Sequence, residues 1–250
     1  MYAPARPDTA GLPLQKLCRN DMNQPDLVIF DCDGVLVDSE ILAARVEADL
    51  LTEAGFEISA EELSETYAGL TFKDILLSVE QRAGIPLQAS LIDKAEQLVD
   101  RRLRQDVRAI EGVHDAVAQV TAQRCICSNS RADRVEFMLE KTGLLPLFAG
   151  RIFSALDTPG AKTKPAPDVF LHAAKTFGAD PARTFVIEDS VHGVTGARAA
   201  GMRVIGFTGA SHSYPGHADA LTEAGAETVI RRWAELKSVL AALSEWSEDA

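Results

Sequence analysis

The chain has 250 residues, of which 46% are hydrophobic, so it can bury a core as one domain with an insertion or as two small domains. Its formal net charge of −12 argues against a nucleic-acid or membrane-surface partner and favours a cytoplasmic protein. The four cysteines are too few for a disulfide scaffold, and no apolar run approaches the ~20 residues of a membrane span. These properties indicate a globular protein.

The first 21 residues contain three prolines and have neither a charged start nor an apolar stretch, so they are not typical of a signal peptide. We expect residues 1–24 to form a poorly ordered tail. Met22 is our hypothesis for the biological start, because the first convincing strand begins five residues later.

An apolar run at residues 27–31 predicts a buried strand, and four helical patterns follow at residues 39–54, 60–67, 71–83 and 88–104. Ser39 is placed to cap the first helix, and Thr71 with Asp74 has the form of a capping box. Almost no strand signal separates these helices. Residues 39–107 therefore predict an all-helical insertion with room to be a cap domain.

Strands and helices alternate after the insertion. We predict strands at 124–127, near 152, at 184–187, at 203–207 and near 228, and helices at 113–123, 132–142, 167–177, 191–201 and 233–243. Such alternation is typical of a parallel sheet with helices on both faces. The predicted fold is α/β, with a doubly wound parallel-sheet core of residues 25–38 and 108–250 and a helical cap of residues 39–107.

Two acids one residue apart, Asp31 and Asp33, directly follow the first strand in the motif Asp-Cys-Asp-Gly. Side chains at positions i and i+2 of a strand point to the same side, so both acids could address one Mg²⁺ ion and one phosphate. Cys32, between them, should point to the other side and into the core. The alternative is an Asp-Gly turn that merely ends a strand.

Three more polar clusters follow predicted strands or precede a predicted helix: Ser128-Asn129-Ser130, Lys164 to Asp168, and Glu188-Asp189-Ser190. The carboxyl ends of parallel strands share one edge of the sheet, so these clusters should converge beside the first motif. Each cluster alone has an ordinary explanation as a helix cap, a solvated loop lysine or a strand end. Their joint occurrence favours a functional site.

These motifs resemble those of the haloacid dehalogenase (HAD) superfamily, in the branch with a helical cap inserted after the first motif. The four family motifs are written here DCDGVLVDSE, CSNS, KPAPD and VIEDS. The resemblance covers the chain from Leu27 to the last helix and implies a Rossmann-like HAD core. It also implies a Mg²⁺-dependent hydrolase that forms an aspartyl phosphate.

The resemblance assigns a role to each motif residue. Asp31 is the implied nucleophile and Asp33 the implied general acid and base, while Ser128 and Lys164 bind the transferring phosphoryl group. The implied magnesium ligands are Asp31, the backbone carbonyl of Asp33, Glu188 and Asp189. Further candidates for phosphate or substrate binding are Gly34, Asn129, Ser130, Glu40, Thr71 and Lys73.

The residues favour a phosphatase over related activities. Asp33 provides an acid that fits an ester leaving group. Dehalogenases and phosphonatases of this family lack an acid at that position. β-Phosphoglucomutases of the same branch carry His and Arg where this chain has Ala43 and Phe72. Both residues that contact the substrate phosphate in the mutases are therefore missing at the expected positions. The predicted function is hydrolysis of a sugar or sugar-acid phosphate, with a phosphomutase as the alternative.

A non-enzymatic phospho-aspartate relay or phospho-ligand module is a further alternative, although receiver domains have no such helical cap. Candidates for substrate specificity are Glu40, Tyr67, Thr71, Phe72 and Lys73, for each of which helix capping or cap packing is an equally good explanation. His114 and His192 are expected to have surface or cap roles, and Arg131 is expected to be solvated, with contact to the substrate as the alternative. We expect a monomer or weak homodimer whose partner is a small phosphorylated metabolite.

Overall fold

The computed structural model describes residues 24–67, 70–84, 89–148, 150–158, 160 and 162–245. The predicted tail lies outside these residues, except for Gln24. In the described part of the chain, no helix is both long enough and apolar enough to cross a membrane.

A six-stranded parallel sheet forms the centre of the molecule, in the order β3-β2-β1-β4-β5-β6. Its strands are β1 (Leu27–Phe30), β2 (Gln123–Ser128), β3 (Ile152–Ser154), β4 (Thr184–Glu188), β5 (Arg203–Phe207) and β6 (Thr228–Ile230). This order reverses between β1 and β4, which is the position where doubly wound sheets bind their ligands. The predicted α/β fold class is confirmed.

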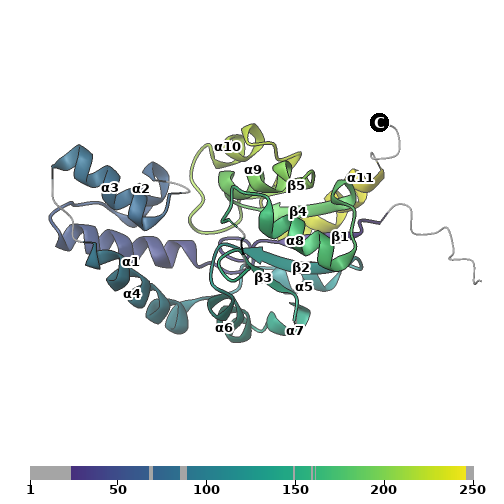
Figure 1. Cartoon of the computed structure of the whole chain (residues 1–250), viewed down its shortest axis with the longest axis horizontal. Coiled ribbons are helices and arrows are strands. Elements are labelled where there is room, and N and C mark those ends of the chain that lie inside the picture. Colours follow the sequence, from purple (N-terminus) through teal and green to yellow (C-terminus); the bar gives the residue numbers. More distant parts are fainter. Residues whose placement is uncertain are drawn as a thin grey trace, which may run out of the picture.

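Helices cover both faces of the sheet because the strands alternate their apolar side chains (Figure 1). Val28 and Phe30 of β1 pack with α5 (Val113–Ala118), α6 (Ala132–Thr142) and α11 (Leu236–Glu245). Leu27 and Ile29 pack with α8 (Asp168–Phe177), α9 (Val191–Ala199) and α10 (His217–Glu223). Cys32 is fully buried with the first of these groups.

The first four helices after β1 in the described residues lie beside the sheet, and we call them the cap (Figure 1). They are α1 (Glu40–Glu53), α2 (Ala60–Thr66), α3 (Phe72–Ala83) and α4 (Ser90–Asp106). The hydroxyl oxygen of Thr71 accepts a hydrogen bond from the backbone N–H of Asp74, and Gly84 ends α3 in the left-handed conformation, as the sequence predicts.

Some short elements differ from the sequence-based expectation. Helix α5 ends at Ala118 rather than near residue 123, because a turn precedes β2. The helix predicted at 233–243 begins with a 3-10 turn, Trp233–Glu235. The short helices α7 (Leu145–Phe148) and α10 and the 3-10 turn Pro181–Arg183 are absent from the prediction, since one or two turns carry little periodicity.

Candidate functional site

Three strand ends at the centre of the sheet bring the polar motifs together. Phe30, the last residue of β1, is in register with Ile126 of β2 and Ile187 of β4. The next residue, Asp31, continues the pairing, since its backbone N–H donates to the carbonyl of Ile187 over 3.0 Å. Asp31 therefore lies beside the ends of both neighbouring strands, as the parallel topology requires.

The side chain of Lys164 connects these strand ends. Its ammonium group donates to Asp31 Oδ1 over 2.5 Å, to Glu188 Oε1 over 2.6 Å and to the carbonyl of Cys127 over 2.7 Å. All three donor positions are thus used, and its side chain is only 3% exposed. Burial alone would lower the pKa of Lys164, but the two carboxylates raise it overall and keep the ammonium charged.

The acids around this lysine are short of positive charge. Burial raises the pKa of Asp31 well above its usual value, and Lys164 opposes that shift only in part, while Glu188 and Asp189 add to it. The pKa of Glu188 is raised for the same reason, by burial and by Asp189 against the pull of Lys164. One lysine does not compensate three neighbouring carboxylates in a buried place.

The side chains of Asp31, Glu188 and Asp189 form a group that fits a metal ion. They can each offer one oxygen atom, and these atoms lie within 4.8 Å of one another. Carboxylate oxygens are the ligands that hard divalent cations prefer. A divalent cation bound between them would supply the missing charge, so the buried acidic cluster is compatible with metal binding.

The carboxylate of Asp33 points to a different set of partners. It accepts hydrogen bonds from the hydroxyls of Ser39 over 2.7 Å and Ser130 over 2.8 Å, with Ser128 at 3.4 Å. The expectation that Ser39 caps α1 is wrong for its side chain, because Ser39 occupies the cap position without a side-chain cap bond and gives its hydroxyl to Asp33. Asp33 is therefore held in place by residues of the first two motifs.

Asn129 and Gly34 have geometric roles around the acids. Asn129 Oδ1 accepts from the backbone N–H of Lys164 over 2.9 Å, which ties the loop after β2 to the lysine loop. Gly34 has a φ of +69°, and a Cβ there would lie 1.9 Å from Asp189 Oδ2. Only glycine allows Asp189 to approach the turn this closely.

Two histidines that the sequence analysis did not single out, His212 and His217, contact Asp189. His212 Nε2 lies 3.1 Å from Asp189 Oδ2, and His217 Nε2 lies 2.6 Å from the Asp189 carbonyl. Burial alone would lower the pKa of His212, but Asp189, with Glu40 and Asp38, raises it to about 9, whereas burial lowers the pKa of His217. The available signal was their place just after the strand predicted at 203–207, on the same sheet edge.

The cap candidates are less closely connected to the site. Glu40 is exposed at the start of α1, where its crowded surroundings and the charge of Asp33 raise its pKa to about 7. Thr71 and Lys73 are exposed at the start of α3, and among the described residues neither has a hydrogen bond or ion pair to the core acids. The structure thus brings Glu40 near the acids and does not do so for Thr71 and Lys73.

Glu47 is a second titratable group of α1 outside our prediction. It lies two turns beyond Glu40 on the same helix face and is half-buried. Burial and the charge of Glu40 raise the pKa of Glu47 to about 8, and no hydrogen bond or ion pair holds it among the described residues. Its carboxylate is therefore destabilised in the folded protein.

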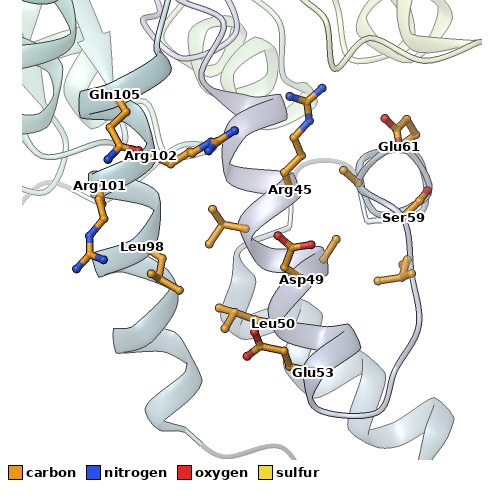
Figure 2. A pocket seen from close by; sticks show the side chains of 14 residues that line it. Arg45, Asp49, Leu50, Glu53, Ser59, Glu61, Leu98, Arg101, Arg102 and Gln105 are labelled. Carbon is orange, nitrogen blue, oxygen red and sulfur yellow. The ribbon is translucent and has the colours of Figure 1, made fainter.

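A hollow of about 620 Å³ opens elsewhere on the cap, between α1, α4 and the start of α2 (Figure 2). Arg45 and Asp49 line it from α1, and Leu98 and Arg101 from α4. None of the strand-end residues takes part in its lining. The hollow is therefore separate from the candidate site.

Comparison with known proteins identifies the family. The family model described as haloacid dehalogenase-like hydrolase matches residues 28–207. A curated relative, the 6-phosphogluconate phosphatase of Escherichia coli (strain K12), is 30% identical over 197 residues, which cover 78% of this chain and 87% of that protein.

Two solved structures are similar over most of their length. One, a haloacid dehalogenase-like protein of unknown function from Agrobacterium tumefaciens strain C58, is 62% identical with a TM-score of 0.85, covering 88% of this chain and 99% of that one. The other, a HAD family hydrolase from Deinococcus radiodurans R1 with bound phosphate and sodium, is 32% identical with a TM-score of 0.76, covering 88% and 96%. The predicted enzyme class, a phosphoric monoester hydrolase, is confirmed, and the chain belongs to the haloacid dehalogenase-like hydrolases.

Proposed function

We propose that this protein is a Mg²⁺-dependent phosphatase that hydrolyses a small phosphorylated metabolite, a sugar or sugar-acid phosphate, through an aspartyl phosphate on Asp31. The observation that carries this proposal is the buried contact of Lys164 with both Asp31 and Glu188, over 2.5 and 2.6 Å, beside Asp189. A nucleophile, a fixed cation and a metal-binding group of acids are then within reach of one phosphoryl group.

Asp31 attacks the phosphorus atom in this proposal, which divides one difficult displacement into two easier ones. The transferring group spreads negative charge over its equatorial oxygens, so the surroundings must supply positive charge and hydrogen-bond donors. In this proposal the buried Lys164 ammonium provides the positive charge, and the buried Ser128 hydroxyl provides a donor. Gly34, Asn129 and Ser130 shape the loops around the same place.

The proposed magnesium ligands are Asp31, Glu188, Asp189 and the backbone carbonyl of Asp33. The grouping of three carboxylates within 4.8 Å supports this assignment. A bound Mg²⁺ ion would neutralise the repulsion between the attacking carboxylate and the phosphate. Without it, the raised pKa of Asp31 works against the ionised form that attacks.

Asp33 is the proposed general acid and base. It protonates the leaving alkoxide and then accepts a proton from the water that hydrolyses the intermediate. Its hydrogen bonds to Ser39 and Ser130 support this role, because they fix the carboxylate beside the nucleophile without a competing cation. Ser39 also begins the connection to the cap, so the position of this acid depends on both parts of the protein.

The substrate class follows from relatives rather than from a contact. The relative named 6-phosphogluconate phosphatase and the Deinococcus radiodurans structure with bound phosphate support a phosphorylated metabolite. Neither Ala43 nor Phe72 has a charged side chain that could bind a second phosphate, which supports a phosphatase over a phosphomutase.

Steady-state release of phosphate from p-nitrophenyl phosphate with Mg²⁺ tests the proposal. We expect many turnovers, and a loss of at least ~10³-fold in kcat for Asp31→Asn, since the nucleophile is removed. A stable stoichiometric phosphoprotein would instead indicate the relay. Faster formation of glucose 6-phosphate than of free phosphate from β-glucose 1-phosphate with a catalytic bisphosphate would indicate the mutase.

A screen of phosphorylated metabolites, including 6-phosphogluconate, phosphoglycolate and hexose phosphates, would then identify the substrate. A sugar or sugar-acid phosphate with the highest kcat/KM is the expected result.

A further inference from the structure

The loop between β5 and α10, residues 208–216, is fixed to the site at several points. In Figure 1 it extends from the sheet towards the cap. The backbone N–H of Ser211 donates to Asp38 Oδ1 over 3.0 Å, and the Ser211 hydroxyl donates to the other oxygen of Asp38. His217, at the start of α10, contacts the Asp189 carbonyl. These contacts hold the loop independently of the His212 ring.

The His212 ring contacts the functional end of Asp189. Its Nε2 lies 3.1 Å from Asp189 Oδ2, so the protonated ring forms an ion pair with this carboxylate, and the two side chains are only 14% and 6% exposed. A Cβ at Gly34 would lie 2.7 Å from the ring and 1.9 Å from Asp189 Oδ2, so both groups are packed against this turn. The other ring nitrogen, Nδ1, is buried and has no hydrogen-bond partner among the described residues.

This arrangement leaves Asp189 oriented by one group. Among the described residues, the ion pair with His212 is the polar contact of the Asp189 side chain, and the same carboxylate belongs to the group of acids that fits a metal ion. A carboxylate held at one oxygen presents the other in a fixed direction. Partners of this kind around a metal site tune its affinity.

We propose that His212 is a positioning residue that orients the carboxylate of Asp189 for the metal ion. The inference rests on the metal site of the proposed function. It assigns to the loop after β5 a part in metal binding, whereas a merely structural His212 would only fill the space beside Gly34.

Direct measurement of metal binding tests this role without relying on turnover. Titration of the purified full-length protein with Mn²⁺, followed by the electron paramagnetic resonance signal of the free ion, gives the dissociation constant for the wild type and for His212→Ala and His212→Gln. We expect about tenfold weaker binding for His212→Ala. His212→Gln keeps an N–H donor near the position of Nε2 and should recover most of the affinity.

The matched control is His192→Ala, at the start of α9, whose side chain has no hydrogen bond or ion pair among the described residues. Its Mn²⁺ affinity should equal that of the wild type. Thermal unfolding without metal should show that His212→Ala is folded, because Ser211 and His217 still hold the loop.

Three results would overturn the inference. Mn²⁺ binding by His212→Ala within twofold of the wild type would show that the ring does not orient Asp189, and tighter binding would show that its charge competes with the metal. Failure of His212→Gln to recover affinity would show that the ring itself, not a donor at the Nε2 position, matters. If the wild type itself bound no Mn²⁺, the metal site of the proposed function would fail first, which distinguishes the two.

Discussion

The strand-end site and the cap are built in opposite ways. At the strand ends, Lys164, Asp31 and Glu188 are buried and bound to one another. In the cap, Thr71 and Lys73 are exposed, and Thr71 bonds only within its own helix turn among the described residues. The difference teaches that the proposed reactive groups are fixed by the sheet, while the groups proposed for substrate recognition are exposed and held by few contacts.

Some contacts between the two regions are polar and partly exposed. Asp100 of α4 accepts from Arg134 of α6 over 2.7 Å and from Arg131 over 3.4 Å, and the Arg104 guanidinium lies 4.2 Å from the Phe137 ring centroid. Arg131, expected to be solvated or to touch substrate, therefore pairs with the cap. Polar contacts of this kind contribute little free energy each, and buried apolar residues of the cap belong to the same hydrophobic cluster as the core.

The largest effect should come from Lys164→Met, which removes the cation at the centre of the strand-end site. Two buried carboxylates would then lack their partner, and we expect the free energy of unfolding to fall by about 3 kcal/mol or more at pH 7 without metal. Urea denaturation measures this change. Phosphatase turnover should be lost as well.

The control for this variant is Lys162→Met, two residues away and exposed, which should change stability by less than about 0.5 kcal/mol. Equal losses in the free energy of unfolding for the two variants would mean that the contacts of Lys164 stabilise the fold no more than those of a surface lysine. The inferred difference between the strand-end site and the cap would then be wrong.

A titratable group in the cap should give an intermediate effect that depends on pH. The pKa of Glu47 is about 8 in the folded protein, against about 4.3 in an unfolded chain. Between these values the folded state holds a proton that the unfolded state has lost, so Glu47 makes the free energy of unfolding fall as pH rises. Glu47→Gln removes this dependence.

We therefore expect Glu47→Gln to match the wild type near pH 4.5 and to be more stable by about 1 kcal/mol or more at pH 8. Urea denaturation at several pH values measures the difference. Asp49→Asn, an exposed change on the same helix, is the control and should show no such trend. A constant difference between Glu47→Gln and the wild type across this range would refute the prediction.

The smallest effect concerns the contact between cap and core. A double-mutant cycle with Asp100→Asn and Arg134→Gln should give a coupling free energy of about 0.5–1 kcal/mol, since the pair is only partly buried. The pair Arg102–Asp106 within α4 is more exposed and should give about 0.3 kcal/mol. A coupling above about 2 kcal/mol for Asp100 and Arg134 would show that the cap is locked to the core.

The sequence predicts the strand-end residues well because their placement follows from topology alone. Once strands are parallel, residues after β1, β2 and β4 must share an edge, so Asp31, Ser128 and Glu188 meet whatever the loops do. The sequence predicts Lys164 through its motif. Which three oxygen atoms accept its hydrogen bonds depends on the conformation of its loop. The capping of α3 by Thr71 is equally local.

Contacts that depend on loop conformation were beyond sequence reasoning. His212 lies in an irregular segment whose path is decided by tertiary contacts such as that of Ser211 with Asp38. Ser39 has the features of a helix cap, yet its side chain accepts no bond from the helix and donates its hydroxyl to Asp33. No pattern along the chain reveals whether a serine hydroxyl will accept from a helix N–H or donate to a carboxylate.

The two connections between core and cap run side by side. Val37 forms an antiparallel bridge with Ala109, the backbone N–H of Asp38 donates to the Arg108 carbonyl over 3.0 Å, and that of Ile110 donates to the Leu36 carbonyl over 3.1 Å. The two ends of the insertion are thus held together where they leave the core. A longer insertion would add only slowly to the entropy cost of bringing these ends together. Another helical insertion joined at these two connections would leave the register of the sheet unchanged. An ancestral protein could therefore change its substrate while it kept the residues at the strand ends.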